Sequence, residues 1–272
     1  MSLLAGKTAI VTGSGRSIGK AVAKLFAENG ARVVVNDLDA APAEETAEEI
    51  RAGGGEVVVC TGSVTDPEVP DRVVQAALDS FGSIDVIVNN AGYTWDGVIH
   101  KMSDDQFDAM LDVHLKAPFR IVRAAAPFLR ESAKADIAAG RTPPCRKIVN
   151  VSSTSGVAGN AGQINYAAGK MGIVGMTKTI AKEWGRFNIC CNAVAYGFIE
   201  SRLTQAKEKG DTTSTGIALG IPRAQREAAI RHIPLHRYGT PEDAAGPVLF
   251  LASPLSDYVT GSVVLVTGGS VV

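Results

Sequence analysis

Seven short runs of apolar, mostly β-branched residues recur along this chain, and segments with helical spacing such as 18–29 and 43–52 separate them. The runs do not alternate polar with apolar residues, which is typical of strands covered on both faces. Strands that alternate strictly with helices predict a parallel sheet with helices on both sides and right-handed crossovers. We therefore expect a doubly wound α/β fold with a seven-stranded, mainly parallel sheet, its strands at 8–12, 33–36, 57–60, 84–89, 147–151, 189–194 and 263–266.

The length and composition of the chain favour one domain that spans residues 1–272. A chain of 272 residues buries a large core, and 46% of its residues are hydrophobic. The 27 lysines and arginines nearly balance the 28 aspartates and glutamates, which excludes a disordered tail protein and an ordinary basic nucleic-acid binder. We expect a small-molecule partner and no nucleic acid.

The sequence predicts neither membrane insertion nor secretion. No apolar run approaches the roughly 18 residues that a membrane helix needs, and residues 1–11 lack a signal-type pattern, so we expect a cytoplasmic protein. The four cysteines form no C-x-x-C pair and no metal-ligand spacing with the four histidines. We therefore expect no disulfide and no metal site, and we interpret Cys60, Cys145, Cys190 and Cys191 as small buried or incidental hydrophobes.

Two segments interrupt the alternation of strands and helices. Residues 131–147 contain Gly140 and the pair Pro143-Pro144, which predicts an extended helix end followed by a loop, and we interpret this segment as an insertion. In residues 201–237, two glycine-containing stretches, one of them rich in threonine, interrupt short helical pieces. Long segments of this kind are often substrate lids, so we expect a lid here.

The first predicted strand runs directly into a glycine-rich segment, Gly13-Ser14-Gly15-Arg16-Ser17-Ile18-Gly19. Glycines permit a tight turn and let backbone N–H groups approach a pyrophosphate, which the positive end of the following helix also attracts. A tight turn with no ligand explains such a segment about as often. The strand before it and the helix after it favour a dinucleotide site.

Asp37 ends the second predicted strand, 18 residues beyond Gly19. A carboxylate at this position can accept hydrogen bonds from a ribose 2′-hydroxyl and repels a 2′-phosphate, which favours NAD over NADP. The alternative is a solvated carboxylate at a strand end. Arg16 could also attract a phosphate and reverse the preference.

A serine, a tyrosine and a lysine follow the fifth predicted strand. Tyr166 and Lys170 stand four residues apart, so on a helix they share one face, where a lysine cation favours the phenolate of a neighbouring tyrosine. Ser153 lies at the carboxyl end of the strand, the edge where ligands bind in open α/β sheets. Each residue alone is more often structural, but the combination predicts a general acid/base near neutral pH.

These segments resemble the short-chain dehydrogenase/reductase family, and the resemblance covers nearly the whole chain. Several independent motifs in the family's order are hard to obtain by chance. The matching pieces are Thr12-Gly13-x₅-Gly19, Asn89-Asn90-Ala91-Gly92, Ser153 thirteen residues before Tyr166, Tyr166-x₃-Lys170, Gly197-x-Ile199-x-Ser201, residues 237–243, residues 250–253, Thr260-Gly261 and Gly268-Gly269.

The resemblance implies a Rossmann-type domain in which Tyr166 is the acid/base and Ser153 orients the substrate oxygen. It implies that Lys170 lowers the pKa of the tyrosine and binds the nicotinamide ribose. It also implies a cofactor site that Tyr166 and Lys170 share with the glycine-rich turn, the strand ends, the adenine site and the nicotinamide loop: Gly13, Ser14, Arg16, Ser17, Ile18, Gly19, Asp37, Leu38, Ser63, Val64, Asn90, Ala91, Gly92, Gly197 and Ile199.

Four residues depart from the pattern of the family. Ser17 replaces the middle glycine of the turn, Ser63 stands where an aspartate commonly contacts the adenine, and Tyr196 replaces the proline of a Pro-Gly pair. His114 occupies the place of a catalytic-site asparagine. It could hold a water in a proton relay to Lys170, or it could be a purely structural histidine.

The leading hypothesis is hydride transfer between NAD(H) and a secondary alcohol or its ketone. The chain looks most like 3-oxoacyl thioester reductases and 3-hydroxyacyl dehydrogenases, so an acyl thioester is one candidate substrate. Steroid and alicyclic alcohol dehydrogenases of the same family share these motifs. Two hypotheses from other classes are a dinucleotide-binding regulator without catalysis and an adenosylmethionine-dependent transferase, which needs no Tyr-x-x-x-Lys.

We expect a homotetramer or, failing that, a homodimer. The helical stretches 103–130 and 161–186 are long and carry small residues, and a helix with a second uncovered face needs a partner. In the family these two helices pair across a two-fold axis. The alternative is that packing within one chain covers both helices.

Overall fold

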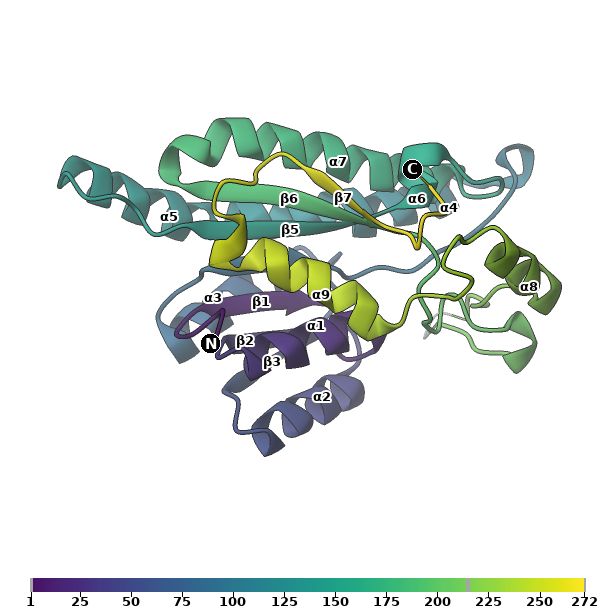
Figure 1. The fold of residues 1–272 in the computed structure, drawn as a ribbon, viewed down its shortest axis with the longest axis horizontal. Helices are drawn as coiled ribbons and strands as arrows, with labels where there is room; N and C mark the ends of the chain where they lie inside the picture. The colour runs from purple at the N-terminus through teal and green to yellow at the C-terminus, as the bar shows by residue number, and fades with distance from the viewer. Residues whose placement is uncertain (1, 214–215, 272) are drawn as a thin grey trace.

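A computed structural model describes residues 2–213 and 216–271 (Figure 1). In this part of the chain seven strands form one sheet in the order β3-β2-β1-β4-β5-β6-β7, and each neighbouring pair is parallel. The predicted strands and fold class are confirmed, and the sheet is entirely parallel. The strands are β1 (Thr8–Thr12), β2 (Arg32–Asp37), β3 (Val57–Thr61), β4 (Val86–Asn89), β5 (Arg146–Ser153), β6 (Ile189–Tyr196) and β7 (Val263–Val266).

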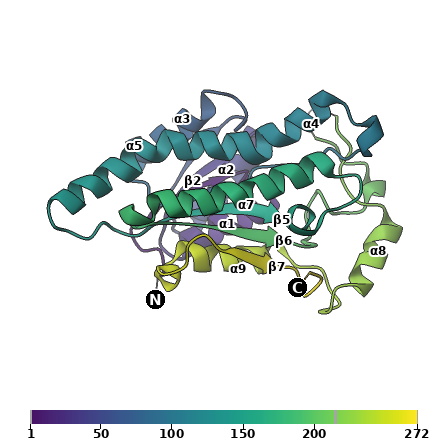
Figure 2. The ribbon, with the colours of Figure 1, turned by 90° about the horizontal axis from the view of Figure 1, so that it is seen from above.

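Helices cover both faces of this sheet, with α5 and α7 on one side and α9 on the other (Figure 2). On one face lie α1 (Ser17–Glu28), α2 (Ala40–Ala52) and α9 (Pro241–Ala252). On the opposite face lie α3 (Val69–Phe81), α5 (Ala117–Ala138) and α7 (Ile164–Trp184). Shorter elements complete the fold: η1 (Ile99–Lys101), α4 (Asp104–Leu111), α6 (Thr154–Ala158), η3 (Gly185–Phe187), η4 (Lys207–Lys209), α8 (Arg223–Arg231) and η5 (Pro254–Ser256).

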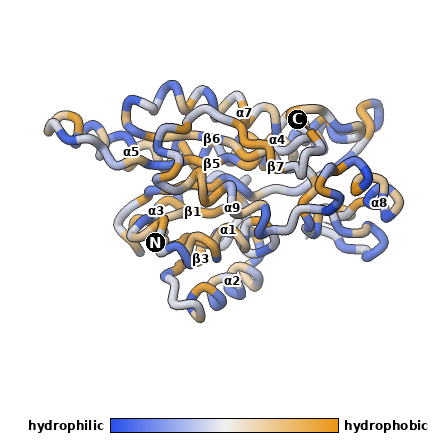
Figure 3. Tube along the Cα trace, viewed as in Figure 1, coloured by the Kyte–Doolittle hydropathy of each residue, from blue (hydrophilic) through white to orange (hydrophobic). Residues whose placement is uncertain are grey.

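Successive side chains of each strand point to opposite faces, so the sheet separates two hydrophobic cores. Ile10 and Ile87 contribute to the core under α3, α5 and α7, whereas their neighbours Val11 and Val88 contribute to the core under α1 and α9. The central strands are mostly apolar, while α2 and α8 carry polar stretches on the outside (Figure 3). This burial on both faces explains why the strands appear in the sequence as continuous apolar runs.

The helical stretch predicted at 103–130 is divided into three parts. A π-helical turn, Asp112–Lys116, separates α4 from α5, and Pro118 follows it in the first turn of α5. Proline has no N–H to donate to the carbonyl four residues earlier, which here belongs to His114, so one α-helical hydrogen bond is missing at this point. Turns of this kind occur frequently at functional sites, and this one carries His114.

The two interrupting segments lie at opposite edges of the sheet. Helix α5 runs on to Ala138 before a loop leads into β5, which confirms the predicted helix end and loop. The 201–237 segment holds η4 and α8 and lies beyond the carboxyl ends of the strands (Figure 1). Residues 214–215 of this segment are outside the described residues.

The strand order reverses between β1 and β4, so the sheet has its topological switch point beside the glycine-rich turn.

Candidate active site

The carboxyl ends of the strands bring the predicted site residues to one edge of the sheet. The glycine-rich turn follows β1, Asp37 ends β2, Asn90 follows β4, Ser153 ends β5 and Gly197 follows β6. These residues are far apart in the sequence, and only the parallel topology makes them neighbours. Ligands of open α/β sheets bind at this edge next to the switch point.

The turn after β1 leaves no room for a Cβ at Gly13 or at Gly19. Gly13 has φ of 62°, and a Cβ there would lie 2.7 Å from the Cα of Ala91. A Cβ on Gly19 would overlap the carbonyl oxygen of Gly13. The Asn90 amide donates to the carbonyls of Thr12 at 2.9 Å and Gly13 at 3.0 Å, which fixes the turn against β4.

Ser17 and Ser14 play different parts in this turn. Ser17 begins α1 in a left-handed conformation with φ of 49°, and its buried hydroxyl has no hydrogen-bond partner among the described residues. The unpaired Ser17 hydroxyl at the N-terminus of α1 can donate to a pyrophosphate. The glycines of the same turn leave room for that group to approach the backbone. Ser14 is completely buried, and both its hydroxyl and its N–H donate to backbone carbonyls, of Val11 at 2.7 Å and of Asn36 at 2.9 Å, so this residue braces the turn.

Asp37 is anchored at the end of β2. One carboxylate oxygen accepts from the N–H of Gly15 at 2.9 Å and the other from the N–H of Asp39 at 3.2 Å. Arg16 forms an ion pair with Asp39 at 2.8 Å and lies 3.8 Å from Asp37. The guanidinium that could attract a 2′-phosphate therefore already has two carboxylate neighbours.

The residues expected at the adenine flank the same strand ends. Leu38 is 54% exposed next to the buried Asp37, which suits an apolar wall for a planar ring. Val64 is buried, and the Ser63 hydroxyl pairs with that of Thr65 at 2.8 Å. Ile18 is half-buried on α1 and packs against the core.

Ser153, Tyr166 and Lys170 lie together at the ends of β5 and α7. The Ser153 hydroxyl is close enough to the Tyr166 phenol to lower its pKa, and it accepts from the N–H of Ser155 at 3.1 Å. The Lys170 ammonium lies 5.5 Å from the centroid of the Tyr166 ring and donates to the carbonyl of Val151 at 2.8 Å. The shared helix face predicted from the i, i+4 spacing is confirmed.

Burial dominates the protonation of this group. Burial raises the pKa of Tyr166 to about 12, the hydrogen bond with Ser153 lowers it, and the nearby charge of Asp96 raises it further. Burial lowers the pKa of Lys170 to about 7. Near pH 7 the tyrosine is therefore a neutral phenol, and the lysine titrates close to neutrality.

His114 reaches the same group from the π-helical turn. Its ring meets the Tyr166 ring edge-on at 4.8 Å between centroids, and its Nε2 lies 2.7 Å from the carbonyl of Tyr93. Burial and the charge of Lys170 hold the pKa of His114 well below its usual value, so the ring is neutral. A carbonyl can only accept, so Nε2 carries the proton and the buried, unpaired Nδ1 is left as an acceptor.

Tyr196 and Gly197 fix the start of the loop after β6. The buried Tyr196 hydroxyl donates to the carbonyl of Ala244 at 2.9 Å and so ties the end of β6 to α9. A Cβ on Gly197 would lie 3.1 Å from the Cα of Thr267, and Ile199 is buried. A Cβ on Gly92 would overlap the ring of His114, so Gly92 leaves room for that side chain.

Sequence reasoning missed a polar network beside Tyr166. The amide of Gln163 donates to both carboxylate oxygens of Asp96 at 3.1 Å and accepts from the Ser155 hydroxyl at 2.8 Å. Asn165 accepts from the N–H of Tyr166 at 2.8 Å and donates to two carbonyls of the 95–106 region. The one sequence signal was their place within three residues of Tyr166 on the same helix end.

None of the helices among the described residues combines the length and the apolar character needed to cross a bilayer. Within 2–213 and 216–271, no three histidine, cysteine, aspartate or glutamate side chains lie in a group that could hold a metal ion.

Comparison with known proteins gives matches along the whole chain. Residues 13–270 match the family model described as "Enoyl-(Acyl carrier protein) reductase". The chain is 39% identical over 269 residues to a 3-oxoacyl-[acyl-carrier-protein] reductase of Thermotoga maritima, with 99% of each chain covered. It is 35% identical over 266 residues to the protein of the same name in Vibrio cholerae, with 98% of each covered, and 38% identical to an uncharacterized oxidoreductase of Mycobacterium bovis, again with 98% of each covered. The chain therefore belongs to the short-chain dehydrogenase/reductase family of oxidoreductases.

Proposed function

We propose that this protein interconverts a secondary alcohol and a ketone by hydride transfer to and from NAD(H), with Tyr166 as the acid/base. The observation that carries the proposal is the buried contact of Tyr166 with Ser153 and Lys170 beside the glycine-rich turn. The geometry supports a base or acid within reach of a substrate oxygen at the edge where a dinucleotide fits.

The protonation of the site favours the reductive direction. Because the pKa of Tyr166 is raised to about 12, its phenol carries a proton at pH 7 and can donate it as a ketone becomes an alcohol. Ser153, which lies beside the phenol, is placed to donate to the same carbonyl oxygen. A bound nicotinamide supplies the hydride in this direction and accepts it in the other.

Lys170 and His114 act behind the tyrosine. The Lys170 amine, anchored on the carbonyl of Val151, can exchange protons near pH 7 because its pKa is lowered to about 7. His114 offers its neutral Nδ1 as an acceptor in the same pocket, which suits a water in a proton relay. We propose that protons lost by Tyr166 are replaced along this route.

The proposed substrate is a 3-oxoacyl thioester or the corresponding 3-hydroxyacyl thioester. Two of the relatives above are named as 3-oxoacyl-[acyl-carrier-protein] reductases, which supports this class. Apolar side chains around the site are exposed, Val98 at 47%, Val157 at 43% and Ile164 at 42%, and suit an acyl chain. Leu219 and Ile233 are buried inside the 201–237 segment, so they do not serve as substrate contacts. The alternative substrates are steroid or alicyclic alcohols.

We propose NAD rather than NADP as the cofactor. Asp37 has a free carboxylate lone pair for a ribose hydroxyl, and a 2′-phosphate would meet this negative charge at close range. Arg16 is not free to neutralise a 2′-phosphate, since it forms an ion pair with Asp39. All residues are proposed to form one domain with residues 201–237 as a lid over the carboxyl edge.

The assembly that we propose is a homotetramer. One apolar face holds Phe119 and Phe128 of α5 with Met171 of α7, all more than 40% exposed, and another holds Leu255 and Tyr258 beyond α9. Two separate apolar faces on one chain permit two different two-fold interfaces, and two such axes generate a tetramer. A monomeric mass in solution at micromolar concentration would refute this assembly.

The test is turnover of Tyr166→Phe, with Tyr258→Phe, an exposed tyrosine away from the site, as the matched control. Oxidation of NADH is followed with 3-oxoacyl thioesters, 2-enoyl thioesters, steroid ketones and alicyclic ketones. We expect 3-oxoacyl turnover that falls by roughly 10²–10⁴-fold in Tyr166→Phe, while NADH binding changes little. A variant that keeps more than about a tenth of the activity would exclude Tyr166 as the acid/base. A wild type that binds NADH but turns over no member of the panel would favour a regulator.

A further inference from the structure

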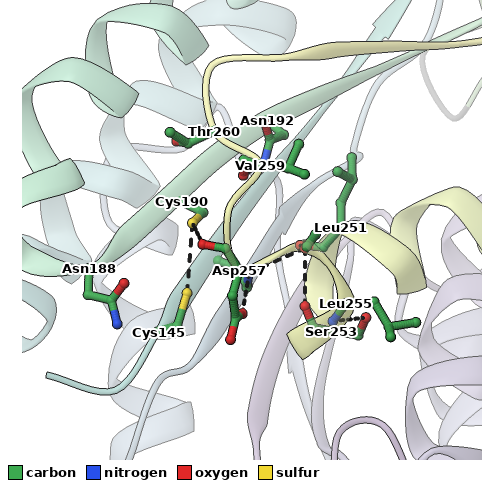
Figure 4. Close-up of polar contacts among 12 residues, drawn as sticks. Cys145, Asn188, Cys190, Asn192, Leu251, Ser253, Leu255, Asp257, Val259 and Thr260 are labelled. Carbon is green, nitrogen blue, oxygen red and sulfur yellow. Dashed lines mark hydrogen bonds and ion pairs between the residues drawn. The ribbon is translucent and has the colours of Figure 1, made fainter. Parts of the chain in front are cut away.

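Two cysteines are in contact at the amino ends of β5 and β6, and the candidate active site lies at the carboxyl ends of the strands. Cys145 directly precedes β5 and Cys190 is the second residue of β6, and their sulfur atoms lie 3.7 Å apart (Figure 4). The two residues are 45 positions apart in the sequence, and strand pairing joins them. Cys145 is partly exposed, whereas Cys190 is buried at 6% exposure.

Charged and polar groups surround this pair. Lys147 of β5 is almost completely buried, and its ammonium lies 2.8 Å from the carboxylate of Asp257 and 3.2 Å from the Ser256 hydroxyl. The Cys190 thiol lies 3.6 Å from the backbone carbonyl of Asp257. These groups come from β5, β6 and the segment after α9, so the pair has polar neighbours and does not lie in an apolar core.

These neighbouring groups change the pKa values of the two thiols. The hydrogen bond from Cys145 and the charge of Lys147 lower the pKa of Cys190 to about 7, against the effects of burial and Asp257. The hydrogen bond with Cys190 and burial raise the pKa of Cys145. Cys190 therefore ionises near neutral pH, and Cys145 is a thiol in contact with it. This is the arrangement of an attacking and a resolving cysteine.

We infer that Cys145 and Cys190 form a redox-modification site that reacts with peroxides and closes to an intramolecular disulfide. In the first step the Cys190 thiolate attacks a peroxide oxygen and the O–O bond breaks. The hydroxide that leaves is protonated to water by the proton that the Cys190 thiol released on ionisation. Cys190 is then a sulfenic acid. In the second step the Cys145 sulfur attacks the Cys190 sulfur, the S–O bond breaks and a second water leaves with the remaining thiol proton. Two thiols and one hydrogen peroxide thus give one disulfide and two waters.

The matched comparator within the chain is Cys60. It is 8% exposed, close to the value for Cys190, but burial raises its pKa and no second cysteine lies in contact with it among the described residues. At about pH 7 iodoacetamide should therefore alkylate Cys190 roughly tenfold faster than Cys60. Equal rates would overturn the assignment of Cys190 as the reactive thiolate.

The decisive experiment treats the reduced, full-length protein with hydrogen peroxide and maps the unreduced peptides by mass spectrometry. We expect a Cys145–Cys190 cross-link in the wild type and in Cys60→Ser, and none in Cys145→Ser or Cys190→Ser. In Cys145→Ser the sulfenic acid at Cys190 should persist and be trapped by dimedone. A wild type with no such cross-link, or with disulfides between chains in its place, would refute the inference.

Discussion

Lys170 offers a test in which stability and activity should change in opposite directions. The side chain is fully buried in α7, and burial lowers its pKa from 10.5 to about 7. In the unfolded chain the amine keeps its ordinary pKa, so between these values the unfolded state binds more protons than the folded state. The free energy of unfolding therefore rises with pH through this window, and the full penalty applies below about pH 7.

The size of the effect follows from the shift in pKa. A difference of about 3.5 pKa units corresponds to about 5 kcal/mol below pH 7, and about 2 kcal/mol of this penalty is left at pH 9. Lys170→Met removes the titration, but it also leaves the carbonyl of Val151 without its 2.8 Å donor, at a cost of about 1–3 kcal/mol. We expect the variant to be about 2–4 kcal/mol more stable than the wild type near pH 6 and within about 1 kcal/mol of it near pH 9.

Urea unfolding of the two proteins at several pH values measures this difference, and the comparison cancels the groups that they share. Lys178→Met is the matched control, because Lys178 is exposed on the same helix and its variant should keep the pH dependence of the wild type. If the Lys170→Met and wild-type curves run parallel between about pH 6 and 9, burial does not lower the lysine pKa and the reasoning fails. The same variant should lose turnover and cofactor affinity.

Three further predictions concern the cofactor, the loop after β6 and the acid/base. Asp37→Ala should narrow a preference for NADH over NADPH that we expect to be about 5- to 150-fold in kcat/KM; equal wild-type use of both cofactors would contradict the role of Asp37. Tyr196→Phe removes the donor to the Ala244 carbonyl and should cost about 1–3 kcal/mol in urea unfolding, and an unchanged midpoint would show that this bond contributes nothing. Because the pKa of Tyr166 is raised to about 12 and alcohol oxidation needs the phenolate, oxidation should accelerate with pH from about 7 to 10, whereas a plateau below about pH 8 would contradict this.

The strands and the glycine-rich turn could be predicted because each depends on local sequence, whereas most of the other site residues follow only from the resemblance to the family. Strands buried on both faces require continuous β-branched runs, and a turn such as Gly13 to Gly19 requires glycine where no Cβ fits. The π-helical turn was not predictable from hydrophobic spacing, since a single π turn lies within a segment whose pattern is helical on both sides.

Contacts between distant segments were beyond the reach of the sequence. Gln163 and Asp96 are 67 residues apart, and their hydrogen bonds exist because the loop after β4 lies along the start of α7. Cys145 and Cys190 are interpreted as separate hydrophobes from the sequence alone, since no short spacing links them. The pairing of β5 with β6 brings them into contact, and only then does Lys147 become their neighbour.

The protonation of the candidate site shows where spacing stops being informative. An i, i+4 pair predicts that Tyr166 and Lys170 share a helix face, and they do, but it does not predict where the ammonium ends or how dry the site is. The Lys170 amine bonds to the Val151 carbonyl, and burial disfavours the charged form of both residues. A site built in this way holds its proton on the tyrosine and gives it up when a substrate oxygen develops negative charge beside it. In the proposed function this chemistry is ketone reduction, so we expect the reductive rate to exceed the oxidative rate at neutral pH when both are measured with saturating substrates.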